Sequence, residues 1–563
     1  MSRFQGRLAG VAALILIAIQ IPLVLRTGGD ASQSDFANYF APAFALAHGR
    51  DLGALYQRDG FERAMSDAGL EGLGSFVPHP PANALWLLPF AGLDPSTAKE
   101  VWTVLLLLGV GLTVWAATML SPRTGVAQAV VVVLLPVLAI RNGLAFGQPY
   151  LLLSAWLALG VVALQSRQSR LGGFLLGLGV SFKPYALVLG LLFIHRDRRR
   201  ALVGFACGAV LPSLLLLGLA GTGPFVEFAS KVLPWMMRAE IQDPFSPGWG
   251  SAAALSNRLF RFELDLNEAP WLDAPILARV LGAGVPASLL SLGVVCGRRA
   301  FARDGPLQGV GVAMLFAVAS SPFVASYQLV LMTIPVLALL ARAPWPKASL
   351  WLFVWFVVGS PLVNAGRAAT GLAAPAAYAR FFVVLGMAIV VAWPWLNRRA
   401  MWIAGVVGAA SGVAALPVGV YQEAWPRIYA ARGYSMARPT FCGDRLRWMS
   451  PSADGRRLEA RGGTETCDAS LPASSERLTI VSRFAEGSFN LYLLPHPSMR
   501  EERLTYSDAN EVDPVLTPDG CAVVFASDQG RGLGSYALYR LDLSRGINEC
   551  GKGWHAGSPP RPQ

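Results

Sequence analysis

The stretch ALVGFACGAVLPSLLLLGLA occupies residues 201–220 and contains no charged side chain. About 20 such residues are what a helix needs to cross the hydrocarbon core of a lipid bilayer. Four arginines stand just before it, at Arg196, Arg198, Arg199 and Arg200. Lys and Arg are retained in the cytoplasmic loops of membrane proteins. The stretch therefore predicts a transmembrane helix that starts on the cytoplasmic side.

The composition of the whole chain agrees with a membrane protein. Of 563 residues, 54% are hydrophobic and 15% are charged, whereas soluble domains are about a quarter charged. The formal net charge is +12, and much of it lies in short loops beside apolar runs, as the positive-inside rule requires. We therefore expect lipid and not nucleic acid as the partner of this charge.

Thirteen apolar runs divide the first part of the chain, and several are shorter than a straight span needs. They lie near residues 8–25, 82–93, 96–120, 126–140, 149–165, 171–195, 201–220, 275–296, 307–320, 326–342, 348–364, 378–396 and 400–420. We expect an α-helical polytopic membrane protein with about 12–13 transmembrane helices.

Charged flanks give the orientation. Arg3 and Arg7 precede the first run, which we interpret as a retained helix and not a cleaved signal peptide, because no convincing cleavage site follows. The sixth, eighth and twelfth runs each end in arginines, the last at Arg398 and Arg399. The pattern predicts a multi-pass protein of the inner (plasma) membrane with a cytoplasmic N-terminus and a periplasmic or extracellular C-terminal part.

The C-terminal part, residues 421–563, is different in kind. Short alternating runs at residues 521–526 and 536–543 predict strands, and Gly, Pro, Ser and Asp separate them. Of six cysteines, Cys207 and Cys296 fall in apolar runs and are expected to be buried; the other four are Cys442, Cys467, Cys521 and Cys550. Two disulfides are plausible outside the cytoplasm, with Cys442–Cys467 and Cys521–Cys550 as the pairing of nearest neighbours, although the sequence does not fix it.

A polar loop at residues 26–80 separates the first two runs and is too long for a simple turn. It opens with Asp35, about ten residues past the first run. A carboxylate near the lipid boundary can act as a general base toward a hydroxyl group, and the alternative is an ordinary helix N-cap. The aromatic residues that follow, from Phe36 to Leu46, suggest a helix lying on the membrane surface.

Lys183 interrupts an apolar run and precedes Pro184, which breaks a helix. A charge at membrane depth usually faces a cavity or a partner, and phosphate is the natural partner of such a lysine. The alternative is a lysine whose long side chain reaches out to the membrane surface.

Other polar segments carry weaker signals. Residues 141–149 form either a binding loop or a turn, and the loop at 221–266 is long enough to cover a site. His79 precedes Pro80 and is either a hydrogen-bond donor or structural. No metal-ligand cluster and no Walker or Rossmann glycine pattern is present. We expect no metal, no cofactor and no nucleotide-sugar donor bound by such a motif.

Several segments, taken in order, resemble glycosyltransferase family 87. They are Ser34-Asp35-x-x-x-Tyr39, Ala47-His-Gly49-Arg-Asp-Leu52, Leu55-Tyr56, Pro78-His79-Pro80-Pro81, Leu87-Leu-Pro89-Phe-Ala-Gly-Leu93, Gly147-Gln148, Lys183-Pro184, Ser256-Asn257-Arg258-Leu259 and Ser321-Pro322-Phe323 ahead of Tyr327. The resemblance covers roughly residues 8–345.

This resemblance implies a GT-C membrane fold and a polyprenyl-phosphate-linked sugar donor, with mannose as the sugar. It implies Asp35 as the general base toward a hydroxyl of a lipid or glycan acceptor, with Lys183 and Arg258 near the lipid phosphate. The remaining implied substrate contacts are Tyr39, His79, Gln148, Asn257 and Tyr327. The sequence departs from the family at Ser326-Tyr327-Gln328, where paired histidines are common, so the acceptor and the sugar stay open.

In the C-terminal part, the segment from Asp513 to Asp528 resembles a TolB-like β-propeller repeat, with a Pro-Asp-Gly turn between two strands. Residues 450–458 resemble a degenerate earlier copy. Two blades do not close a propeller, so we expect a partial sheet with an interaction role.

Two alternatives to an enzyme follow from the same residues. A lipid or solute transporter with an accessory β domain would show inverted repeats and paired broken helices, and the sequence shows one break, at Lys183-Pro184. A non-catalytic scaffold would leave the long acidic first loop without a purpose.

Overall fold

The computed structural model describes most of the chain. The described residues are 3–27, 35–70, 74–121, 125–183, 186–237, 243–263, 266–364, 366, 368–416, 437–442, 445–451, 458–461, 478–485, 488–495, 502–506, 509–518, 520–529 and 536–543. The chain divides into two compact units. The first is mainly helical and comprises Met1–Ala229, Ser246–Arg261 and Pro270–Leu416, and the second comprises Ser230–Phe245, Phe262–Ala269 and Pro417–Gln563 with all of the described C-terminal strands.

The first half of the helical unit alternates long helices with short 3-10 turns. Its elements are α1 (Arg3–Thr27), α2 (Ala37–Ala47), η1 (Gly53–Tyr56), α3 (Arg58–Asp67), η2 (Pro81–Leu85), η3 (Leu88–Phe90), α4 (Pro95–Leu120), α5 (Val126–Leu134), α6 (Val137–Ala145), α7 (Tyr150–Gln165), α8 (Ser169–Phe182), α9 (Leu187–Gly190), η5 (Leu191–Phe193), η6 (Arg196–Arg198), α10 (Arg199–Ala220) and α11 (Gly223–Glu227).

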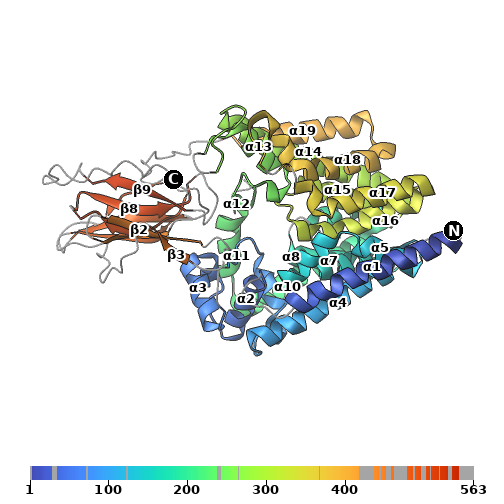
Figure 1. Cartoon of the computed structure of the whole chain (residues 1–563), viewed down its shortest axis with the longest axis horizontal. Coiled ribbons are helices and arrows are strands. Elements are labelled where there is room, and N and C mark those ends of the chain that lie inside the picture. The colour runs from blue at the N-terminus through green and yellow to red at the C-terminus, as the bar shows by residue number, and fades with distance from the viewer. Residues whose placement is uncertain are drawn as a thin grey trace. The chain divides into compact units, whose positions relative to one another are not determined.

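In the second half, α14, α15, α18 and α19 lie side by side (Figure 1). The elements there are α13 (Ala252–Phe260), α14 (Pro275–Asp304), α15 (Pro306–Ser320), η9 (Ser326–Met332), α16 (Thr333–Arg342), α17 (Trp345–Val358), η10 (Pro361–Asn364), η11 (Gly371–Tyr378), α18 (Ala379–Ala392), η12 (Trp393–Trp395) and α19 (Arg398–Ala414). Between the halves stand η7 (Phe228–Val232), α12 (Leu233–Met237) and η8 (Pro247–Trp249).

The fold class expected from the sequence is confirmed, but most spans are not long continuous helices. Among the described residues, four helices are long and apolar enough to cross a membrane, at 95–120, 196–220, 275–304 and 371–395. A fifth span results if α5 and α6, bent by 69° at their junction, are counted as one. Six further apolar helices have only 10–17 residues. Helix breaks such as Pro136 shorten the remaining runs, because proline cannot donate a backbone hydrogen bond.

Two of the thirteen expected spans are wrong in detail. The run at 82–93 is not a span, since it folds into the 3-10 turns η2 and η3. The run at 171–195 is not one helix either: α8 ends at Phe182, and Lys183 has extended backbone angles (φ −147°, ψ 125°). One expected run is therefore lost, and another is divided at Lys183.

The split run is held by a close, parallel contact between α8 and α10. A Cβ added at Gly173 or Gly177 would come within 3.0 Å of the backbone of Ala201 or Phe205, and one added at Gly204 or Gly208 would meet the backbone of α8 in the same way. A glycine four residues later on one helix meets a residue four positions later on the other helix. The two helices therefore run in the same direction. Small residues spaced by four let helices pack backbone to backbone in membranes.

This register places Lys183 and the arginines at opposite ends of the contact between the two helices. Arg199 and Arg200 start α10 beside the start of α8, whereas the end of α8 lies roughly three turns further along α10, near Pro212. The chain then returns through α9 and η5: Gly190 lies against the ring of Phe205, and Arg198 donates a hydrogen bond to the carbonyl of Leu192 at 2.7 Å.

Arginines from several helix ends gather at this one end. Arg298 donates to the carbonyl of Ile194 at 2.7 Å and Arg299 to that of Trp395 at 2.9 Å. Arg342 pairs with Asp304, which also accepts a hydrogen bond from the indole of Trp395 at 3.0 Å. Helices far apart in the sequence therefore share one basic, aromatic end.

Two expectations about side-chain environment are corrected. The helix expected after Asp35 exists as α2, but Phe36, Tyr39 and Phe40 are at most 1% exposed and pack inside the protein instead of on the membrane surface. Cys296 is buried as expected, whereas Cys207 is exposed on α10. One face of α10 packs on α8, and exposed apolar side chains such as Val203 and Leu214 cover much of the rest of this helix.

The C-terminal strands form three small antiparallel sheets, each a meander of three strands. The strands are β1 (Ala437–Cys442), β2 (Arg445–Pro451), β3 (Leu458–Arg461), β4 (Leu478–Ala485), β5 (Ser488–Pro495), β6 (Glu502–Arg503), β7 (Glu511–Leu516), β8 (Ala522–Ser527) and β9 (Ala537–Asp542).

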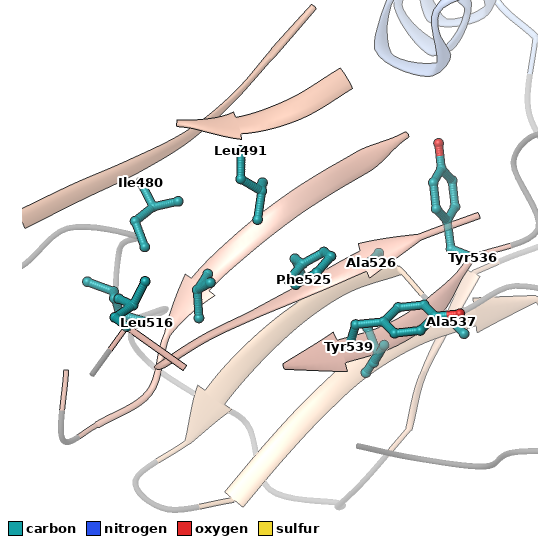
Figure 2. Packing of buried hydrophobic residues seen from close by; sticks show 11 residues of the cluster. Ile480, Leu491, Leu516, Phe525, Ala526, Tyr536, Ala537 and Tyr539 are labelled. Carbon is teal, nitrogen blue, oxygen red and sulfur yellow. The ribbon is translucent and has the colours of Figure 1, made fainter. Parts of the chain in front are cut away.

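Packing between the second and third sheets supplies the core of this unit. Figure 2 shows Phe525 and Tyr539 of the third sheet with Ile480 and Leu491 of the second. Every residue of β8 is buried, and its neighbours β7 and β9 pair with it on either side. The two strands expected from the sequence are confirmed as β8 and β9.

The TolB-like interpretation of this part is not supported, because the described strands form only small three-stranded sheets. Cys521 is disulfide-bonded. The pairing expected for the four C-terminal cysteines cannot be followed further, since the side chains of Cys442, Cys467 and Cys550 lie outside the described ones.

Candidate functional site

A short chain of hydrogen bonds links two segments that are far apart in the sequence. Asp35 directly precedes α2, and Gln148 lies in the turn between α6 and α7. The Gln148 side-chain amide donates to Asp35 Oδ2 at 2.6 Å, and the Tyr39 hydroxyl donates to Gln148 Oε1 at 2.8 Å. Gln148 is thereby fixed in one amide orientation and holds one oxygen of the Asp35 carboxylate. Within the described part of the chain, the other oxygen has no hydrogen-bond partner.

The environment of Asp35 raises the pKa of its carboxyl group above 3.8. Burial is the main cause, because it disfavours the charged form. The Gln148 hydrogen bond and the positive charges of Lys183 and Lys99 act in the opposite direction. A carboxylate with a raised pKa holds a proton more firmly than an ordinary aspartate, which is a useful property in a general base.

Gly147 makes the turn that brings Gln148 to Asp35. Its φ is +67°, and a Cβ at this position would lie 2.8 Å from Lys99 Nζ and 2.9 Å from Phe36 Cβ. The Gly147 carbonyl accepts a hydrogen bond from the Trp102 indole at 2.7 Å. The backbone conformation and the lack of space both require glycine here.

Lys99 is fully buried beneath this turn. Its ammonium group donates to the carbonyls of Leu144 and Ala145 at 3.0 and 3.2 Å. These carbonyls end α6, where a cation is favoured by the helix dipole. Lys99 therefore fixes the end of the helix that delivers Gln148.

Lys183 approaches the same site from the end of α8. Its side chain is 8% exposed, and no hydrogen bond or ion pair holds its ammonium group within the described part of the chain. The Nζ atom lies 5.8 Å from the centre of the Tyr150 ring. Tyr150 in turn contacts Tyr327, with ring centres 5.4 Å apart. The charge of Lys183 is close enough to influence Asp35.

His79 forms another side of the cluster. It is 3% exposed, and its ring lies 4.6 Å from that of Tyr39. Its backbone carbonyl accepts a hydrogen bond from the Tyr56 hydroxyl at 2.7 Å. Burial, assisted by the charge of Lys183, lowers the pKa of His79 well below 6.5. The imidazole is therefore neutral at physiological pH.

The structure thus brings together six of the eight residues selected from the sequence. Asp35, Tyr39, His79, Gln148 and Lys183 form the cluster, and Tyr327 joins it through Tyr150. The two others, Asn257 and Arg258, lie on α13, which packs against α14 and η11.

Sequence reasoning missed Lys99, Trp102 and Tyr150. Lys99 follows the helix cap of α4, where Asp94 accepts hydrogen bonds from the backbone amides of Ser96 and Thr97. A lysine in the first turn of a helix usually points to solvent. Only the fold shows that this one reaches a helix end about 45 residues further along the chain.

Within the described residues, no group of three or more His, Cys, Asp or Glu side chains has an arrangement that could hold a metal ion. The chemistry available to this cluster is therefore a carboxylate, an amide, a neutral imidazole, phenols and an ammonium group. Such a set suits proton abstraction beside an anionic ligand.

Comparison with known proteins gives one finding. Residues 76–322 match the model of glycosyltransferase family 87. The matched range contains His79, Gln148 and Lys183, and it begins after Asp35 and Tyr39 and ends before Tyr327. No curated protein and no solved structure matches the chain. With its apolar helices, the match indicates a membrane glycosyltransferase, which requires a sugar donor and an acceptor.

Proposed function

We propose that the chain transfers a hexose, with mannose as the first candidate, from a polyprenyl-phosphate donor to a hydroxyl group of a lipid or glycan acceptor. The observation that carries this proposal is the pairing of two groups at one site. One oxygen of the half-buried Asp35 carboxylate accepts a hydrogen bond from Gln148, and the other has no hydrogen-bond partner among the described residues. The buried Lys183 ammonium lies nearby without a paired anion among the described residues.

The two groups suit the two partners of one substitution reaction, Asp35 the attacking hydroxyl group and Lys183 the leaving phosphate. Asp35 accepts the proton of the acceptor hydroxyl as its oxygen forms a bond to the anomeric carbon. The bond from that carbon to the phosphate oxygen breaks, and its electron pair stays on the departing polyprenyl phosphate. Lys183 stabilises the negative charge on this leaving group, because an ammonium ion in a buried site interacts strongly with phosphate.

We further propose that the reaction takes place on the non-cytoplasmic face in a GT-C-like fold. The arginine-rich ends of α10, α14 and α19 mark the cytoplasmic side by the positive-inside rule. The register of α8 on α10 puts Lys183 at the end of α8 that points away from these arginines. The same arrangement directs α19 outward, so the C-terminal strands would share a compartment with Asp35.

Lys183→Met is the direct test of the phosphate site. We expect kcat/KM for the polyprenyl-phosphate donor to fall roughly 10- to 100-fold, which is the usual worth of one charge-assisted hydrogen bond. Lys183→Arg keeps the charge and should recover part of the loss. Steady-state transfer of labelled sugar in detergent micelles measures both variants.

Arg303→Met is a suitable control, because Arg303 is an exposed cation near the basic end of α14. It should leave kcat/KM within about twofold. Equal activities of Lys183→Met and Arg303→Met would remove Lys183 from the donor site.

Gln148→Leu tests how the site tunes its base. The hydrogen bond from Gln148 lowers the pKa of Asp35, whereas burial raises it. Removing the hydrogen bond therefore raises the pKa of Asp35 further. Activity requires the ionised carboxylate and is lost as the pH falls through its pKa. The acid limb of the kcat/KM profile should therefore move to higher pH in Gln148→Leu. An acid limb that stays in place would show that another group sets it.

A further inference from the structure

Three buried polar atoms in one short segment have no hydrogen-bond partner in the described part of the chain. They are His79 Nδ1, Asn83 Oδ1 and Trp86 Nε1. His79 is 3% exposed and Asn83 is fully buried. An unsatisfied buried polar group costs about 1–3 kcal/mol, and such groups are rare in folded proteins. Three such atoms within eight residues indicate that this segment binds a ligand whose polar groups supply the missing hydrogen bonds.

The segment is held rigidly by its other contacts. The Asn83 amide nitrogen donates to the carbonyls of Pro80, Ser181 and Phe182 at 3.2–3.4 Å. These bonds leave Oδ1 as the atom of Asn83 without a partner. The Trp86 ring stacks on that of Phe182, with centres 4.3 Å apart and planes 11° from parallel. Trp156 contacts both rings, at 4.8 and 5.1 Å.

The same contacts place the segment beside the proposed phosphate site. Phe182, which touches both Asn83 and Trp86, is the residue before Lys183. His79 is near enough to Lys183 to feel its charge, and its ring packs on Tyr39, the hydrogen-bond partner of Gln148. The segment that carries the three polar atoms therefore borders the cluster that contains Lys183 and Asp35.

We propose that residues 79–86 form the sugar-recognition wall of the site, with His79 Nδ1, Asn83 Oδ1 and Trp86 Nε1 bonding to hydroxyl groups of the donor hexose. This inference rests on the proposed function, because the hexose is joined to the phosphate that Lys183 holds. The set offers a donor, an acceptor and an imidazole nitrogen that can be either. Sugar hydroxyl groups both donate and accept, so a hexose satisfies all three atoms, whereas a lipid chain satisfies none.

Trp86→Phe separates recognition from structure. It keeps an aromatic ring on Phe182 and removes only the indole N–H. If that N–H has no role in binding, its removal should leave thermal stability equal or higher and ligand affinity unchanged. If it bonds to the sugar, affinity should fall about tenfold, the worth of one hydrogen bond, without a loss of stability.

The experiment is isothermal titration of the full-length protein in detergent with mannose 1-phosphate, glucose 1-phosphate and inorganic phosphate. We expect the wild type to bind one of the hexose phosphates more tightly than phosphate. Trp86→Phe should weaken that hexose phosphate about tenfold and leave inorganic phosphate unchanged. Trp156→Phe, in the same aromatic group but without an unpartnered buried N–H, should change neither.

His79→Phe provides a second variant if Trp86→Phe proves unstable, since it keeps a ring against Tyr39 and the backbone carbonyl that Tyr56 binds. Wild-type affinity for the hexose phosphate in either stable variant would overturn the recognition wall while leaving the proposed function intact. Binding of all three probes to Lys183→Met as to wild type would instead defeat the proposed function.

Discussion

Asp35→Asn is expected to lower kcat for sugar transfer roughly 10²- to 10⁴-fold, which is the usual contribution of a general base. Asparagine has nearly the shape of aspartate, and its carbonyl oxygen can still accept the hydrogen bond from Gln148 that is 2.6 Å long in the wild type. The substitution removes only the capacity to take a proton. KM for the donor should therefore change little. Initial rates with labelled polyprenyl-phosphate mannose measure the effect.

Asp51→Asn is the matched control for this prediction. Asp51 is an exposed carboxylate of the same loop, and it accepts a hydrogen bond from the backbone amide of Gly53 at 2.8 Å. Its loss costs only a local turn contact, and activity should stay within about twofold of the wild type. An Asp35→Asn enzyme as active as Asp51→Asn would exclude Asp35 as the base.

Gly204→Ala should have the largest effect on stability. A Cβ at Gly204 would come within 3.0 Å of the Arg170 carbonyl, so α8 and α10 must move apart. Overpacking of this kind costs about 1–3 kcal/mol. We expect a clear fall in the thermal unfolding temperature in detergent, together with reduced transfer, because α8 carries Lys183 at its end.

Gly218→Ala controls for helix propensity, because Gly218 lies on the same helix with nothing within 4 Å of its Cβ position. Alanine favours helix by about 1 kcal/mol over glycine, so this variant should be as stable as the wild type or more so. The double variant Gly173→Ala with Gly204→Ala should lose less than the sum of the two losses, since one separation accommodates both methyl groups. Equal melting temperatures for Gly204→Ala and Gly218→Ala would refute the close contact.

Hydrophobicity and charge were sufficient to predict the class of fold, because they depend on composition over 20-residue windows. They were not sufficient to predict which runs are continuous helices. The run at 171–195 looks like one span in a hydropathy profile, yet it breaks at Lys183. The parallel contact of α8 with α10 depends on glycines that the sequence displays, but nothing local tells which helix faces which.

In the candidate site, too, the sequence predicted individual residues but not the contacts between segments that are far apart in the chain. Asp35 and Lys183 could be selected because each is a charge in an unusual place along the chain. The hydrogen bond between Asp35 and Gln148 depends on the Gly147 turn and on Lys99, which lie on other elements. The unpartnered atoms of Asn83 and Trp86 could not be found at all from the sequence, since a missing hydrogen bond is a property of the folded protein.

Two of the C-terminal strands, β8 and β9, were predicted correctly because alternation and turn residues act over a few positions. Their grouping was not, because the Pro-Asp-Gly turn at residues 518–520 is compatible with many antiparallel sheets. The structure arranges the described strands in three-stranded meanders.

The central claim is that the Asp35 site joins a sugar from a polyprenyl phosphate to an acceptor hydroxyl. Its most direct test gives purified wild type and Asp35→Asn, in sealed vesicles, a doubly labelled polyprenyl-phosphate mannose and a membrane lipid extract as acceptor. We predict equal amounts of released polyprenyl phosphate and mannosylated product from the wild type, and initial rates of both that are roughly 10²- to 10⁴-fold lower from Asp35→Asn. Movement of intact donor across the vesicle membrane without any covalent product would contradict the account and favour a transporter.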